Sequence, residues 1–74
     1  MEYRITCINK AVTEDSVAVA DLGGVNAEGD RWTMSVDEAA ELLSSGDGVF
    51  FLESEKLKAI EPESRRLLKL PSCP

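Results

Sequence analysis

The 74-residue sequence has no histidine, only two cysteines and only four aromatic side chains. Without histidine, the commonest general base is missing. Two thiols are too few for a structural zinc site within one chain. The serines have no obvious activating partner, and Ser35 is explained as a helix cap. We therefore expect no catalytic residue, no metal site and no cofactor.

The sequence also lacks a run of about 18 apolar residues, the length that suggests a membrane-spanning helix. No basic segment followed by an apolar one opens the chain, as it would in a signal peptide. We therefore expect a cytoplasmic protein without a membrane segment. Because the cytosol is reducing, we expect Cys7 and Cys73 to be unlinked thiols. A disulfide stays open geometrically if the first strand and the C-terminal end are neighbours.

Positive charge is scarce in the middle of the chain. Residues 28–55 carry eight acidic side chains and one base, Arg31, whereas residues 56–74 carry five bases and two acids. The net charge of −6 disfavours nucleic acid and anionic membranes as partners, because both attract cations. The acidic middle favours a basic protein partner. A separation of acidic and basic residues along the chain is, however, also typical of a protein with two solvent-exposed faces.

Alternating apolar and polar residues predict several short strands. In "YRITCIN" (3–9), Tyr3, Ile5 and Cys7 share one face. A turn is expected over 10–15, further strands over 16–22, 31–34, 49–54 and 65–71, and a strand or short helix over 56–60.

The strongest local signal is "SVDE" (35–38), a capping box. The Ser35 hydroxyl can accept the Glu38 N–H, and the Glu38 carboxylate can reach back to the Ser35 N–H. Apolar residues at helical spacing follow, and Gly46 is a natural left-handed stop. The sequence thus predicts a single α+β domain over 1–74. Its small, mostly antiparallel sheet has about five or six short strands, and one helix (36–45) packs on it.

The glycine-rich stretch "DLGGVNAEGDRW" (21–32) first suggests a phosphate site. Gly23, Gly24 and Gly29 match no phosphate-binding spacing, and a strand rather than a helix follows them. We interpret the stretch as a bend that connects two strands.

Three stretches together resemble a known family. "YRITCINK", "GGVNAEGDRWTMSVDEAAELLSSG" and "LLKLPSCP" are similar to the small bacterial family catalogued as domain of unknown function 3892. The resemblance covers roughly the first 54 and the last eight residues, and the chain is shorter than the family norm between Glu53 and Leu67. It implies that Trp32, Cys7 and Cys73 are family positions and implies no activity.

These observations favour a non-catalytic protein-interaction module, such as an acidic inhibitor or nucleic-acid mimic acting on a basic partner. Homo-oligomerisation is left open. The candidate partner-binding residues are Glu28, Asp30, Trp32, Asp37, Glu38, Glu41 and Asp47. Trp32 is expected either in the core or partly exposed as an interface anchor. The alternative is a small-ligand, metal or redox-responsive module that uses the Trp32 region or Cys7 and Cys73.

Overall fold

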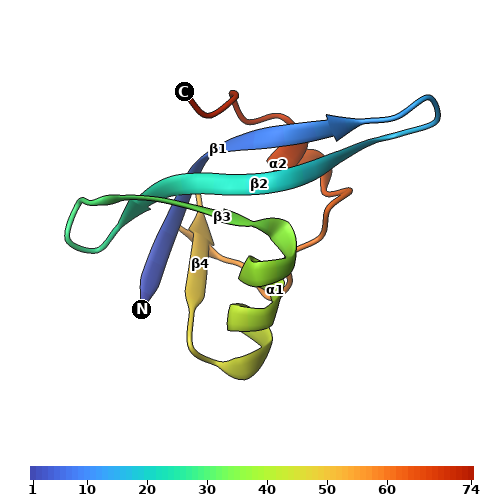
Figure 1. Cartoon of the computed structure of the whole chain (residues 1–74). Helices are drawn as coiled ribbons and strands as arrows, with labels where there is room; N and C mark the ends of the chain where they lie inside the picture. The colour runs from blue at the N-terminus through green and yellow to red at the C-terminus, as the bar shows by residue number, and fades with distance from the viewer.

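A computed structural model describes all 74 residues and has one five-stranded sheet with the strand order β3-β2-β1-β4-β5 (Figure 1). The elements are β1 (Glu2–Val12), β2 (Val17–Asn26), β3 (Arg31–Ser35), α1 (Val36–Ser45), β4 (Val49–Leu52), β5 (Glu55–Lys56) and α2 (Arg65–Leu68). Only β1 and β4 pair in parallel, and the other neighbours are antiparallel. The predicted α+β fold, a mostly antiparallel sheet with one main helix packed on it, is confirmed.

The helix α1 begins and ends where the sequence predicts. The Ser35 hydroxyl accepts a hydrogen bond from the Glu38 N–H at 3.1 Å, which is the first half of the capping box. Gly46 ends the helix in the left-handed region, with φ of 85°. The apolar stripe buries Val36 and Ala39, and α1 packs against β2, β3 and β4.

The hairpin of β1 and β2 is longer than the sequence predicts, and it projects from the rest of the molecule (Figure 1). The turn expected over 10–15 is misplaced, because Val12 still pairs with Val17. The turn lies at Thr13–Ser16, where the Thr13 N–H donates to the Ser16 carbonyl at 2.8 Å and the Thr13 hydroxyl accepts the Ser16 N–H at 3.1 Å. This backbone bond and this side-chain bond define a tight turn and let both strands continue to its edge.

A β-bulge in β1 decides which residues enter the core. Ile5 pairs with Gly24 but Cys7 pairs with Gly23, so Thr6 is the extra residue. The side chains of Ile5 and Ile8, three residues apart, are therefore both buried in the core. The prediction that Cys7 shares a face with Ile5 is wrong, because the extra residue moves Cys7 to the opposite face.

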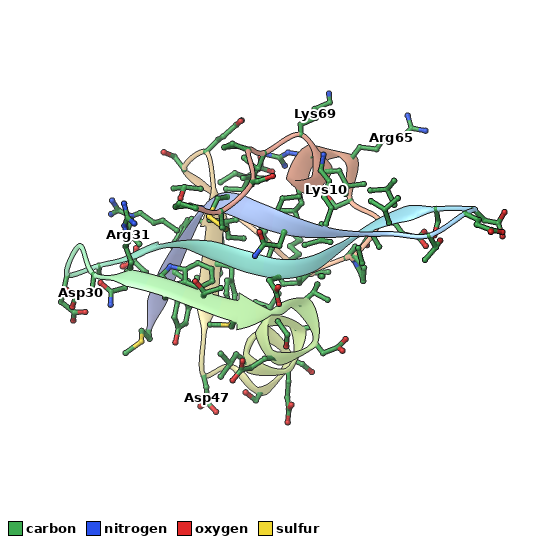
Figure 2. The ribbon with its side chains drawn as sticks, turned by 45° about the horizontal axis from the view of Figure 1, so that its top comes forward. Lys10, Asp30, Arg31, Asp47, Arg65 and Lys69 are labelled. Atoms are coloured by element: carbon green, nitrogen blue, oxygen red, sulfur yellow. A yellow bond between two sulfur atoms is a disulfide. The ribbon has the colours of Figure 1, made fainter.

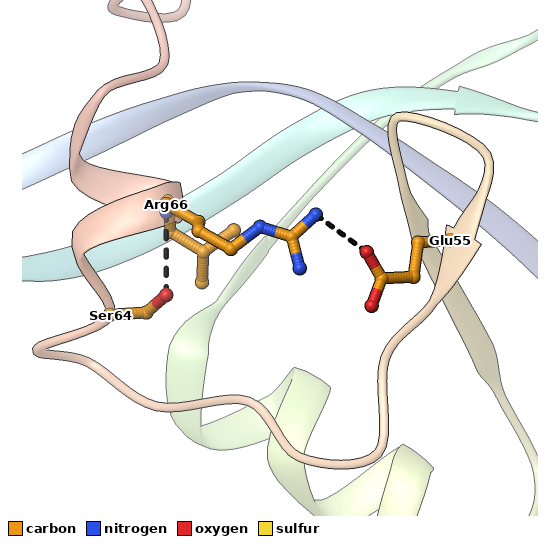
Figure 3. Close-up of polar contacts among 4 residues, drawn as sticks. Glu55, Ser64 and Arg66 are labelled. Atoms are coloured by element: carbon orange, nitrogen blue, oxygen red, sulfur yellow. Dashed lines mark hydrogen bonds and ion pairs between the residues drawn. The ribbon is translucent and has the colours of Figure 1, made fainter.

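The C-terminal region differs from the prediction. The expected strand over 65–71 is wrong, because its first residues form the single-turn helix α2. Ser64 caps this helix by accepting the Leu67 N–H at 3.4 Å (Figure 3), and Leu67 is buried. Arg and Leu favour helices intrinsically, so a local cap outweighs the strand pattern. Of the segment 56–60, only Lys56 belongs to a strand.

The final residues return to the sheet beside β1. The Ile8 N–H donates to the Pro71 carbonyl, and the Cys73 N–H donates to the Ile8 carbonyl, both at 3.0 Å. This pairing brings the Cys7 and Cys73 Cα atoms to 4.9 Å, and the two cysteines form a disulfide. The prediction of unlinked thiols is therefore wrong. Neither α1 nor α2 has the length and apolar character needed to cross a membrane.

Candidate functional site

Four of the predicted partner-binding residues lie on α1 and the turn that follows it. Asp37, Glu38, Glu41 and Asp47 are all exposed, and we call them the acidic helix surface. Asp37 and Glu41 are four residues apart and Glu38 and Glu41 are three apart, so each pair consists of neighbours on the helix. The caps at the two ends of α1 fix the positions from which these carboxylates project.

None of the four carboxylates of the acidic helix surface forms an ion pair. The chain has one ion pair, between Arg66 and Glu55 at 2.9 Å (Figure 3), and it involves none of the four carboxylates. Asp37 and Glu38 lie in the first turn of α1, where the helix dipole stabilises negative charge. Asp47 lies beyond the C-terminal end, where the dipole disfavours a carboxylate. The helix dipole therefore favours the first two acids but does not favour Asp47.

Local hydrogen bonds hold Asp47 in a defined position. Its carboxylate accepts the Ser45 hydroxyl at 3.2 Å, and its backbone N–H donates to the Leu42 carbonyl at 3.1 Å. Its own carbonyl accepts the N-terminal ammonium at 3.4 Å. The negative charge is thus fixed next to the helix end rather than left on a free loop.

Glu28 and Asp30 form a separate acidic group at the turn between β2 and β3. The Asn26 side-chain oxygen accepts both backbone N–H groups, at 3.0 and 2.9 Å, and Gly29 supplies the left-handed residue with φ of 85°. Figure 2 shows Asp30 at this hairpin tip and Asp47 beside α1, well apart. The six predicted acids therefore form two groups rather than one patch.

Trp32 belongs to an aromatic cluster within the core. Its ring meets Tyr3 edge-on at 5.0 Å and Phe50 at 5.9 Å, while Tyr3 stacks on Phe50 at 4.9 Å. The side chain is half-buried, and its Nε1 is buried without a hydrogen-bond partner. These internal contacts match the core interpretation of Trp32 better than the exposed-anchor interpretation.

The disulfide lies over the face of the sheet away from α1, and it needs a glycine at position 23 to fit against β2. A Cβ atom added to Gly23 would lie 2.7 Å from the Cys73 sulfur and 2.8 Å from the Cys7 sulfur. Gly23 and Gly24 lie within β2, so the bend expected over 21–32 is confined to the turn at its centre. Gly24 also has a packing role, since a Cβ there would overlap the Arg4 carbonyl oxygen.

The chain contains no cluster of three or more His, Cys, Asp or Glu side chains arranged to hold a metal ion. Comparisons with protein-family models, curated proteins and solved structures find no match for this chain. Membership of the domain of unknown function 3892 family therefore stays a prediction. Function has to be inferred from the chemistry of the surface.

Proposed function

We propose that this protein is a non-catalytic interaction module whose acidic helix surface binds a basic protein partner. The observation that carries the proposal is the set of four exposed carboxylates on and beside α1, none of which forms an ion pair within the chain. Such a surface attracts a basic partner over the Debye length and raises the rate of association.

The position of the bases supports this proposal. Figure 2 places Lys10, Arg65 and Lys69 on the side of the molecule away from Asp47 and α1. A partner that approaches α1 therefore meets little opposing positive charge. One specific form of the function is a nucleic-acid mimic, in which the carboxylates occupy the phosphate sites of a DNA- or RNA-binding protein.

Affinity capture with matched baits tests the proposal. The first bait carries Asp37→Asn, Glu38→Gln, Glu41→Gln and Asp47→Asn. The control bait removes four charges elsewhere, through Glu14→Gln, Asp15→Asn, Glu61→Gln and Glu63→Gln. We expect the natural chain and the control to retain the same basic protein from a host lysate at about 0.15 M salt, and the first bait to lose it.

Two results would contradict the proposal. One is equal capture by both baits, because the acidic helix surface would then be dispensable. The other is a partner without excess positive charge. Urea unfolding of both baits provides the folding control, because the first-turn acids of α1 also interact with the helix dipole.

The second candidate function is a redox-responsive module, and the disulfide is the observation that favours it. Cys7 and Cys73 tether the C-terminal segment to β1, and a two-electron reduction to two thiols would release that tether. Because cytosolic reductants oppose structural disulfides, such a bond in that compartment would report the redox state. Partner binding that changes at least about tenfold between oxidised and reduced protein would favour this candidate.

A further inference from the structure

A row of in-register residues crosses all five strands on the face of the sheet away from α1. Val25 on β2 pairs with Arg31 on β3 and with Arg4 on β1. Arg4 pairs with Phe51 on β4, and Phe51 pairs with Lys56 on β5. Register partners project from the same face of a sheet, so these five side chains form one line. We call it the basic row: Arg31, Val25, Arg4, Phe51 and Lys56.

The basic row points away from the core. Tyr3 and Ile5, on either side of Arg4 in the chain, pack in the core, so Arg4 projects from the other face. Arg31, Arg4 and Lys56 are exposed, and none of them takes part in an ion pair. Figure 2 shows Arg31 on the side of the sheet away from Asp47 and α1. Three of the eight bases of this acidic chain thus lie on one surface and form no ion pair.

Two grooves open beside the basic row and share Thr6 in their linings, one on the side of Arg4 and the other on the side of Arg31. One groove, of about 370 Å³, is lined by Val25, Arg31 and the disulfide and has no acidic side chain. The other, of about 440 Å³, is lined by Arg4 and Phe51 but also by Glu2 and Glu53. The surface is therefore hollowed beside Arg4 and beside Arg31, and the groove beside Arg31 has fewer acidic side chains than the groove beside Arg4.

The spacing of the bases indicates the shape of the ligand. Neighbouring strands lie about 4.8 Å apart, so bases two strands apart are separated by roughly 9.6 Å. A polyproline II segment has three residues per turn and rises about 3.1 Å per residue, so its every third side chain repeats at about 9.3 Å on one side. The apolar Val25 and Phe51 lie between the bases and can contact proline rings.

We propose that the basic row binds an extended protein segment with an acidic residue at every third position. Nucleic acid fits this surface less well, because the row offers only one aromatic ring, Phe51, for base stacking. The partner differs in charge from that of the acidic helix surface and uses the other face. The two proposals therefore stand or fall separately.

Fluorescence anisotropy with labelled peptides tests this inference. The probe is a twelve-residue peptide with four repeats of Glu-Pro-Pro, and the matched peptide has the same composition with its four glutamates in one block. The test variant is Arg4→Gln with Arg31→Gln. The control is Arg65→Gln with Lys69→Gln, which removes the same charge from the α2 region.

We expect the natural chain to bind the spaced peptide at least about tenfold more tightly than the blocked one. The test variant should lose at least about tenfold in affinity and the control less than about threefold, because two charge-assisted contacts are removed only in the former. Glu2→Gln should strengthen binding, since it removes a carboxylate from the groove beside Arg4.

Any of three results would overturn the proposal, provided that urea unfolding shows both double variants to be folded. The first is no binding of the spaced peptide at millimolar concentration. The second is equal affinity for the two peptides or equal losses in the two variants. The third is tighter binding of oligothymidylate than of either peptide, which would identify the row as a nucleic-acid surface.

Discussion

Reduction of the Cys7–Cys73 disulfide should remove most of the stability of this protein. The bond joins residues 66 positions apart, so it closes nearly the whole chain into a loop. In the chain-entropy model, a loop of this size stabilises the folded state by about 4 kcal/mol. A domain below about 70–80 residues rarely gains more than about 3–5 kcal/mol from its hydrophobic core alone. The free energy of unfolding of the reduced protein should therefore be much smaller.

Urea unfolding with and without a phosphine reductant measures this difference. We expect the free energy of unfolding to fall by about 4 kcal/mol on reduction, and the m-value to rise because the unfolded chain without its cross-link exposes more surface. The variant with Cys7→Ala and Cys73→Ala provides the control. It should resemble the reduced protein and should not respond to the reductant.

A difference below about 1 kcal/mol would refute this reasoning, because loop closure would then not constrain the unfolded chain as the entropy model requires. Two free thiols in protein purified without reductant would contradict the structure more directly. The mass of the oxidised protein should be about two units below that of the reduced protein, because disulfide formation removes two hydrogen atoms.

Three further predictions concern stability, each measured by urea unfolding. Gly23→Ala should cost about 1–3 kcal/mol in the oxidised protein, because the new Cβ would lie within 2.8 Å of both disulfide sulfurs, and less after reduction; an equal cost in both states would contradict this. Ser35→Ala should cost about 0.5–2 kcal/mol through the lost helix cap, and no change would show that the cap does not contribute. Glu55→Gln should cost less than about 1 kcal/mol, because the side chains of Arg66 and Glu55 are 48% and 64% exposed; a larger loss would show that this ion pair is structurally important.

Features set by short-range chemistry were predictable from the sequence. The helix α1 has its predicted bounds because Ser35, the apolar stripe and Gly46 all act within one or two turns. The acidic helix surface follows from the same local pattern. The α2 helix was missed because a single turn leaves too little periodicity to distinguish it from a strand, although Ser64 was an available cap signal.

Features that depend on strand register, or on contacts between residues far apart in the chain, were not predictable. One extra residue at Thr6 reverses the faces of everything that follows in β1, and nothing in the local composition marks that position. The disulfide depends on a bridge between Ile8 and Ser72, which are far apart in the chain. The basic row likewise exists only because four strand pairs align Arg4, Arg31 and Lys56.

The salt dependence of binding tests the central claim, that the acidic helix surface recognises a basic partner. The Kd of the captured partner is measured between low and high ionic strength for the natural chain and for the variant with four neutralised carboxylates. The account predicts a Kd that rises with salt for the natural chain, and a weaker, nearly salt-independent Kd for the variant. The same Kd and the same salt dependence for both proteins would contradict it.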